Sequence, residues 1–118
     1  MNKAKYGKRI VVELPQELIS IIPCANNAIR AFILGNLGEI SRPALNKGKN
    51  AALRLSKTTL ELINYKRRSW RWTKREVIVA ALTLATAKGY FVLDNEATLR
   101  EIDEREARYE QNRKIQKM

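Results

Sequence analysis

The sequence predicts a mainly α-helical protein that contains a short β-ribbon, and three observations lead to that prediction. Apolar and polar residues alternate in two short segments, 8–14 and 50–55, as they do in half-exposed strands. A capping signal at Thr73 precedes a mostly apolar run from Val77 to Ala87, which is typical of a buried helix. Each strand-like segment is followed by two helix-like segments, so the pattern occurs twice along the chain.

Residues 1–38 are predicted to form one strand-helix-helix unit. The strand Lys8–Leu14 has two faces, which hold Ile10, Val12 and Leu14 on one side and Arg9, Val11 and Glu13 on the other. A short helix is expected over Gln16–Ile22, where Pro23 interrupts it. A second, more apolar helix is expected over Asn26–Leu37.

Residues 39–49 are predicted to be a linker, because Ser, Pro, Asn and Gly interrupt every apolar pattern there. After the linker the strand Asn50–Leu55 is expected to turn Ala51, Leu53 and Leu55 inward. Ser56 can cap a helix that runs from about Lys57 to Ser69.

The helix that follows has the best-defined start in the chain. Thr73 and Glu76 have the spacing of a capping box, and Trp72 can pack on Val77 as a hydrophobic staple. The helix is apolar on nearly all sides, and one strand and two helices cannot cover every side of one of their own members. The sequence therefore predicts that this helix is buried in the core of a dimer.

Residues 94–118 carry seven acids and six bases. Asp94 can cap a final helix over Asn95–Arg113, in which only Leu99, Ile102 and Tyr109 suggest an apolar stripe. A helix with so few apolar residues is marginal, so we expect it to pack lightly on the core or to be partly disordered.

The composition of the 118 residues narrows the function. The chain is 45% apolar and carries a formal net charge of +11, and Arg42 to Arg75 holds eleven bases and one acid. Such a surplus of positive charge favours a polyanionic partner over a merely solvated face.

The chain has no histidine, which excludes histidine-dependent catalysis and most zinc sites. The lone Cys24 suits a buried thiol in a reducing compartment. No catalytic residue, cofactor or metal is expected.

The segment Asn50–Gly89, "NAALRLSKTTLELINYKRRSWRWTKREVIVAALTLATAKG", resembles the ribbon-helix-helix (Arc/CopG-like) family of DNA-binding proteins. An alternating strand, a helix of three turns and a capped apolar helix follow one another in the order of that family. The resemblance implies a DNA-binding domain over residues 50–93. It also implies an intertwined homodimer whose paired strands enter the major groove of double-stranded DNA.

The strand period predicts which side chains face the DNA. With the apolar residues turned inward, the base-readout candidates are Asn50, Ala52 and Arg54. Arg54 can bond guanine, Asn50 can bond adenine and Ala52 can touch a thymine methyl group. An ordinary exposed strand residue is the alternative at each position.

Phosphate contacts are expected at the start of the last core helix, where free N–H groups and the helix dipole favour an anion. The predicted phosphate-binding residues are Lys57, Arg71, Thr73, Lys74 and Arg75. Thr73 can also be a cap and nothing more. Trp70 and Trp72 can stack on bases, but their positions at a helix end favour packing.

Two functional hypotheses remain open from the sequence. The first is a sequence-specific DNA-binding protein, a transcriptional repressor or a plasmid or phage maintenance regulator. The second is an antitoxin or assembly adaptor whose charged tail, 94–118, binds a partner protein. Non-specific binding of RNA or single strands and an enzyme are weaker alternatives.

The sequence leaves the pairing of residues 1–38 open, and it also indicates where the protein is expected to act. The first half has Glu13 where the second has Arg54, so residues 1–38 can be a degenerate copy that pairs within the chain or forms a separate element. No apolar segment has the length of a secretory signal or a bilayer span, so a cytoplasmic, nucleoid-associated protein without membrane contact is expected.

Overall fold

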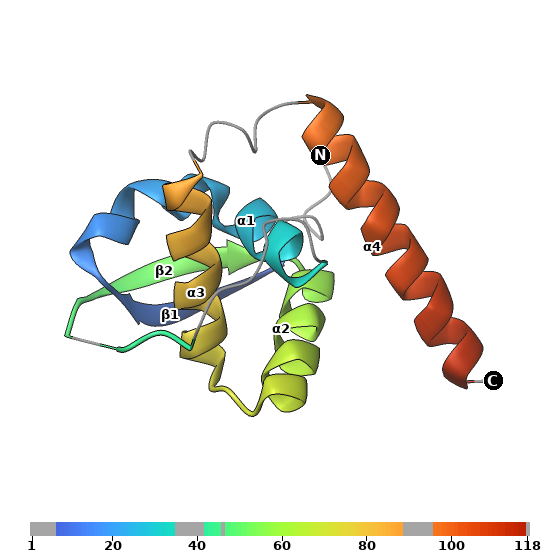
Figure 1. Cartoon of the computed structure of the whole chain (residues 1–118), viewed down its shortest axis with the longest axis horizontal. Coiled ribbons are helices and arrows are strands. Elements are labelled where there is room, and N and C mark those ends of the chain that lie inside the picture. Colours follow the sequence, from blue (N-terminus) through green and yellow to red (C-terminus); the bar gives the residue numbers. More distant parts are fainter. Residues whose placement is uncertain (1–6, 35–41, 46, 89–95, 118) are drawn as a thin grey trace.

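The computed structural model describes residues 7–34, 42–45, 47–88 and 96–117. It is mainly helical, with one two-stranded sheet. Figure 1 shows the strands on one side of the molecule with the helices packed over them, and α4 along an edge. The predicted class, mainly α with a short β-ribbon, is confirmed at this level.

The sheet is an antiparallel ribbon of β1 (Lys8–Leu14) and β2 (Lys49–Leu55), which come from the two halves of the chain. Leu14, Leu53 and Leu55 are completely buried. Their neighbours along each strand face the other way, because side chains alternate across a strand. Both predicted strands are confirmed, and β2 begins one residue earlier than expected.

The first half continues with a 3₁₀ helix, η2 (Gln16–Cys24), and with α1 (Ala25–Ile33). The expected short helix is present, but it continues through Pro23 instead of ending before it. The second helix is also present, one residue earlier than predicted. It ends at Ile33, with Leu34 as its C-cap, before its predicted end at Leu37, which lies outside the described residues, as does part of the predicted linker.

The second half continues with α2 (Lys57–Trp70) and α3 (Lys74–Ala87). The Ser56 hydroxyl caps α2 by accepting a hydrogen bond from the Thr59 N–H, and Arg71 ends the helix in the left-handed conformation. Both predicted helices and both predicted caps are confirmed. The predicted staple between Trp72 and Val77 stays a prediction.

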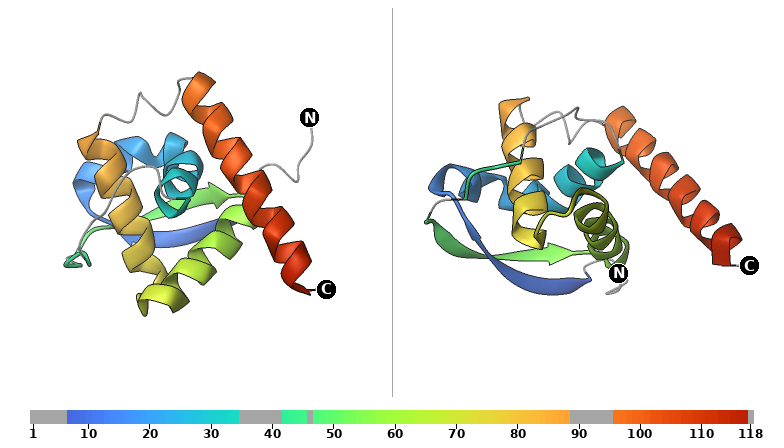
Figure 2. Two further views of the ribbon diagram at one scale, coloured as in Figure 1. Left: turned by 45° about the vertical axis from the view of Figure 1, so that its right-hand side comes forward. Right: turned by 60° about the horizontal axis from the view of Figure 1, so that its bottom comes forward.

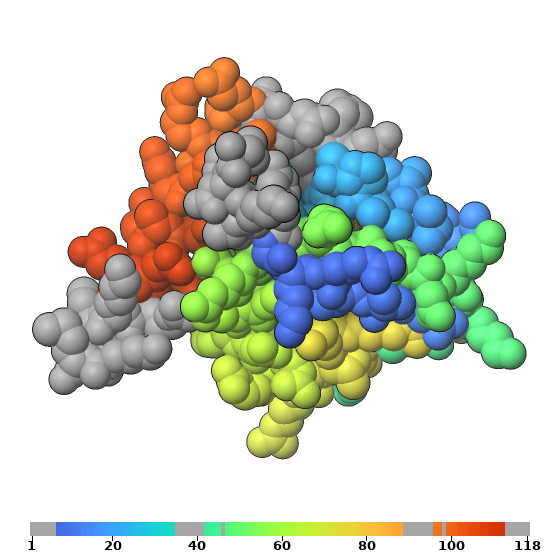
Figure 3. Space-filling model, turned by 180° about the vertical axis from the view of Figure 1, so that it is seen from behind, coloured from blue at the N-terminus to red at the C-terminus, as the bar shows by residue number. Residues whose placement is uncertain are grey.

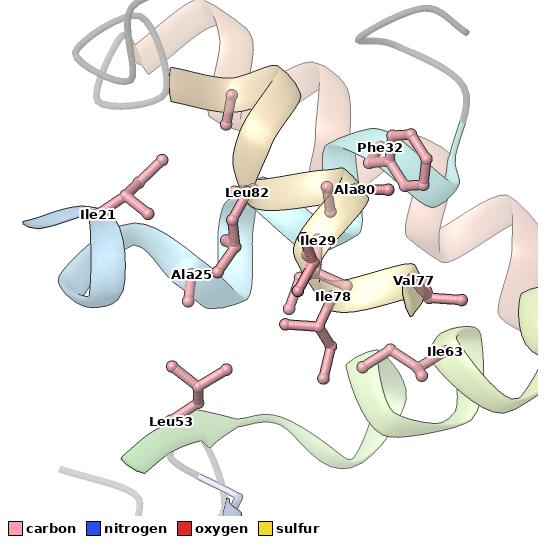
Figure 4. Packing of buried hydrophobic residues seen from close by; sticks show 14 of the residues in the cluster. Ile21, Ala25, Ile29, Phe32, Leu53, Ile63, Val77, Ile78, Ala80 and Leu82 are labelled. Carbon is pink, nitrogen blue, oxygen red and sulfur yellow. The ribbon is translucent and has the colours of Figure 1, made fainter. Parts of the chain in front are cut away.

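The core forms where the two halves meet. In α3 every residue from Glu76 to Leu82 is buried, and in α1 every residue from Ala28 to Ile33 is buried. Helix α1 packs against α2 and α3, and α3 also packs against η2 and β1. Figure 4 shows Ile29 of α1 and Ile78 of α3 close together above Leu53 of the ribbon.

This packing answers the question of what covers the apolar helix. The sequence predicted that α3 needs a second chain, but α1, η2 and β1 of its own chain cover it. Of the two pairings left open for the ribbon, the structure has the one within the chain. The core therefore does not require a dimer, and an intertwined homodimer stays a prediction.

Helix α4 (Glu96–Lys117) packs on this core more firmly than its sequence indicated. Ile102 is completely buried, and Leu99 and Tyr109 are partly buried against the core. The Arg30 guanidinium of α1, itself nearly buried, donates hydrogen bonds to Asp103 at 2.5 Å and to Glu106 at 2.6 Å. The expected helix is thus confirmed, whereas its expected Asp94 cap lies outside the described residues.

Candidate nucleic-acid interface

The outer face of the ribbon consists of three rungs, each with one residue from each strand. Arg9 lies opposite Arg54, Val11 opposite Ala52 and Glu13 opposite Asn50. All except Glu13 are exposed, and Glu13 is partly exposed. The right view of Figure 2 shows η2, α1 and α3 on the other side of the ribbon, and Figure 3 shows β1, in blue, uncovered at the surface.

The outward orientation predicted for Asn50, Ala52 and Arg54 is therefore confirmed. Sequence reasoning missed their cross-strand neighbours, above all Arg9. The signal was available, because the alternation in β1 places Arg9, Val11 and Glu13 on one face. Only the pairing of β1 with β2 shows that this face continues the face of Arg54.

The rung of Arg9 and Arg54 places two positive charges directly opposite each other. Neither guanidinium has a hydrogen bond or an ion pair with any residue in the part of the chain that the structure describes. Like charges in directly opposed positions destabilise an antiparallel pair. An anion or a hydrogen-bond acceptor from outside would relieve that repulsion and use the donors of both guanidinium groups.

The rung of Glu13 and Asn50, at the other end of the ribbon, has the opposite character. The Glu13 carboxylate accepts a hydrogen bond of 2.7 Å from the Gly48 N–H, and its Oε1 lies 3.7 Å from Nη2 of Arg75. A Cβ at position 48 would lie 2.0 Å from the Leu14 carbonyl oxygen, so only glycine allows this approach. The Glu13 carboxylate is therefore held at the strand end by the Gly48 N–H and by the Arg75 guanidinium.

The start of α3 joins this end of the ribbon. The Arg75 Nε donates a hydrogen bond of 3.0 Å to the Glu13 carbonyl oxygen. At the other end the Ser56 N–H, just after β2, donates a hydrogen bond of 2.9 Å to Oδ1 of Asn26 in the first turn of α1. Thus α3, in the second half of the chain, begins at the end of β1, and α1, in the first half, begins at the end of β2.

The predicted capping box at the start of α3 is present. The Thr73 hydroxyl accepts from the Glu76 N–H at 3.2 Å, and the Glu76 carboxylate accepts from the Thr73 N–H at 2.8 Å. Arg42 binds the same carboxylate with two hydrogen bonds, of 2.5 and 3.0 Å. Arg42 and then the Thr73 N–H lower the pKa of Glu76 from 4.5 to about 2.

The predicted phosphate-binding residues lie at three places in the fold, the start of α2, the end of α2 and the start of α3. Lys57 is exposed in the first turn of α2, just after Arg54 and its strand. Thr73 and Lys74 are exposed at the start of α3, next to Arg75, and Arg71 is exposed at the end of α2. Arg75 is partly buried and contacts Glu13, so it serves the fold as well.

The two tryptophans contact each other and neighbouring side chains, and Trp70 stays 37% exposed. Trp70 makes an edge contact with Phe32 at 5.6 Å and a tilted contact with Trp72 at 4.6 Å. The Lys66 ammonium lies 4.4 Å from the Trp70 ring centre, and burial lowers the pKa of Lys66. These contacts agree with the expectation that packing is their main role.

Comparisons with known proteins found no match. No family model, no curated protein and no solved structure is similar to this chain. Among the described residues, no helix is both long and apolar enough to cross a membrane. The same residues contain no group of three His, Cys, Asp or Glu side chains placed to hold a metal ion.

Proposed function

We propose that this protein is a sequence-specific double-stranded DNA-binding regulator that inserts its β1–β2 ribbon into the major groove. In this proposal the two halves of one chain form the paired unit that ribbon-helix-helix proteins build from two chains. The observation that carries it is the exposed rung of Arg9 and Arg54, two directly opposed arginines whose guanidinium groups have no partner among the residues that the structure describes.

The shape of the ribbon supports this target. The major groove of B-DNA is about 12 Å wide and admits a two-stranded β-ribbon. Helices η2, α1 and α3 lie behind the ribbon, and its outward-facing residues are exposed or partly exposed, so this face is open to a duplex (Figure 2). An arginine that reaches a base edge there can form two hydrogen bonds with O6 and N7 of guanine.

The surroundings of the ribbon supply the second kind of contact that DNA binding needs. Lys57 follows one end, and Lys74 in the first turn of α3 lies near the other. Phosphates flanking the groove would meet a lysine side chain at each end of the ribbon. At the start of α3 the helix dipole would add to this attraction. The net charge of +11 adds a non-specific attraction to the duplex.

The role most consistent with such binding is that of a repressor or of a plasmid or phage maintenance regulator, acting in the cytoplasm on chromosomal or plasmid DNA. The adaptor hypothesis receives less support. Asp103, Glu106 and Glu110 of α4 contact Arg30 and Thr58 of the core, so these acids are engaged within the chain. A helix held in this way has a structural role whether or not it also binds a partner.

The test is a selection of binding sites from random duplex DNA at physiological salt, followed by affinity measurements on the selected site. Arg54→Ala should weaken specific binding about 10- to 100-fold, because one bidentate base contact contributes about 1–3 kcal/mol. Arg108→Ala, at an exposed position of α4, removes the same charge away from the ribbon and should change affinity less than about threefold. Equal effects of the two substitutions would contradict the proposal, and so would tighter binding to RNA competitor than to duplex.

A further inference from the structure

The two ends of the ribbon are chemically different, and this difference follows from pairing within one chain. At one end Arg9 faces Arg54, and at the other Glu13 faces Asn50. A ribbon made of two β2 strands from two chains would be symmetric, because Arg54 would lie opposite Asn50 at both ends. The pairing in the structure abolishes that symmetry.

The arginine end can only donate hydrogen bonds, because a guanidinium has no acceptor. In the major groove its partner is guanine, which presents the two acceptors O6 and N7. Adenine presents one acceptor beside an amino donor, and cytosine presents only an amino donor. This end therefore selects for guanine.

The glutamate end has the reverse preference. The Glu13 carboxylate accepts one hydrogen bond from Gly48 and lies beside Arg75, and its side chain is 34% exposed. A carboxylate has about four lone-pair sites, so it can still accept from a base amino group. Cytosine N4 and adenine N6 supply such a group, and Asn50 across the rung can bond adenine in bidentate fashion.

The middle rung is apolar and separates the two ends. Val11 is 58% exposed and lies opposite Ala52, so the centre of the face offers methyl groups. The C5 methyl of thymine is the complementary group in the major groove. Arg9 and Glu13 are four residues apart, which is about 13 Å along a strand and about four base-pair steps.

We propose that one chain recognises a non-palindromic duplex site in a single orientation, with guanine at the Arg9–Arg54 end and an amino-bearing base, adenine or cytosine, at the Glu13–Asn50 end. Glu13 is then a specificity-determining residue. It attracts base amino groups and repels the acceptor edges of guanine and thymine. The inference rests on the proposed function and adds the polarity of the site and its base classes.

The experiment repeats the site selection with the full chain and with three variants, Arg54→Ala, Glu13→Gln and Arg108→Ala. The wild type should select a motif whose two ends differ. Arg54→Ala should relax the preference at the guanine end alone, by about tenfold or more in affinity ratio. Glu13→Gln keeps an acceptor for the Gly48 N–H and adds a donor, so it should admit guanine or thymine at the other end alone. Arg108→Ala should leave the motif unchanged.

The outcomes separate this inference from the proposed function. A palindromic motif in which Arg54→Ala relaxes both ends equally would overturn the inference and would leave DNA binding in place. A one-ended effect of Arg54→Ala with no change of base preference in Glu13→Gln would overturn the role of Glu13. No enrichment of any sequence would overturn the proposed function itself. Circular dichroism of each variant confirms that a lost preference is not a lost fold.

Discussion

The Arg75 side chain donates a hydrogen bond of 3.0 Å to the Glu13 carbonyl oxygen and so ties the first turn of α3 to the last rung of the ribbon. Arg75→Met should lower the free energy of unfolding by about 1–2 kcal/mol, because a hydrogen bond from a charged donor is lost. Lys74→Met, at the neighbouring exposed position, should change it by less than about 0.5 kcal/mol. Urea denaturation measures both, and equal values would show that the contact does not stabilise the fold.

Pairing of the ribbon within one chain can be tested with cysteines at the middle rung. In a Cys24→Ser background, the double variant Val11→Cys, Ala52→Cys places two thiols on directly opposed residues, whose Cβ atoms are about 5 Å apart. Mild oxidation should cross-link it as a monomer on a non-reducing gel. Ala52→Cys alone is the control and should stay uncross-linked. Two chains paired through β2 would instead bring two copies of residue 52 together and produce a covalent dimer.

Acid should weaken the fold through Glu76. The pKa of this carboxyl group is about 2 in the folded protein because Arg42 and the Thr73 N–H stabilise its charged form. In the unfolded chain the Glu76 carboxyl group has a pKa near 4.5, so it binds a proton at higher pH than in the folded protein. The contribution of Glu76 to stability is therefore complete above pH 4.5 and is lost as the pH falls from 4.5 toward 2.

Glu76→Gln should remove this part of the pH dependence while it keeps an acceptor for the Thr73 N–H. Glu104→Gln, at an exposed position of α4, should keep the wild-type dependence. Urea midpoints between pH 2 and 7 provide the measurement. A wild-type profile in Glu76→Gln would mean that other carboxylates account for the acid sensitivity.

Helix α4 should depend on Arg30 for its attachment. Arg30 is 8% exposed and binds Asp103, Glu106 and also Asn27, so Arg30→Met removes several charged hydrogen bonds at once. A loss of about 2 kcal/mol in unfolding free energy is expected. The control Arg100→Met breaks an exposed pair with Glu96 and should cost less than about 0.5 kcal/mol. If the two losses are equal, the Arg30 contacts do not hold α4.

The sequence predicted most of the elements because their signals are local. Period-two alternation located both strands, and the capping residues Ser56 and Thr73 located the starts of α2 and α3 to the residue. The 3₁₀ character of η2 was not predictable in this way. The local signal at Pro23 predicted a break, but η2 contains this proline and ends one residue after it.

The pairing of the elements was not predictable, because it depends on contacts between distant parts of the chain. The strand 8–14 offered the same alternation to any partner, so a second chain and the second half were equally compatible with it. The apolar surface of α3 indicated that a cover is needed but not which segment supplies it. For the same reason Arg9 could not be joined to Arg54 until the register was known.

Ion pairs between residues far apart in the chain were also not predictable from the sequence. An arginine between Ile29 and Ala31 in an apolar helix was a signal that a buried charge needs a partner, but it did not point to Asp103 and Glu106. Likewise, Glu76 was predicted as a capping residue, whereas its pairing with Arg42 came only from the fold.

Because β1 and β2 belong to the same chain, the ribbon forms by folding and not by association. A ribbon shared between two chains separates when their concentration falls below the dissociation constant of the pair. The fraction of this protein that carries a complete ribbon is independent of how many copies a cell contains. Under the proposed function, occupancy of a single DNA site should then rise in simple proportion to copy number at low abundance, without the threshold that prior dimerisation imposes.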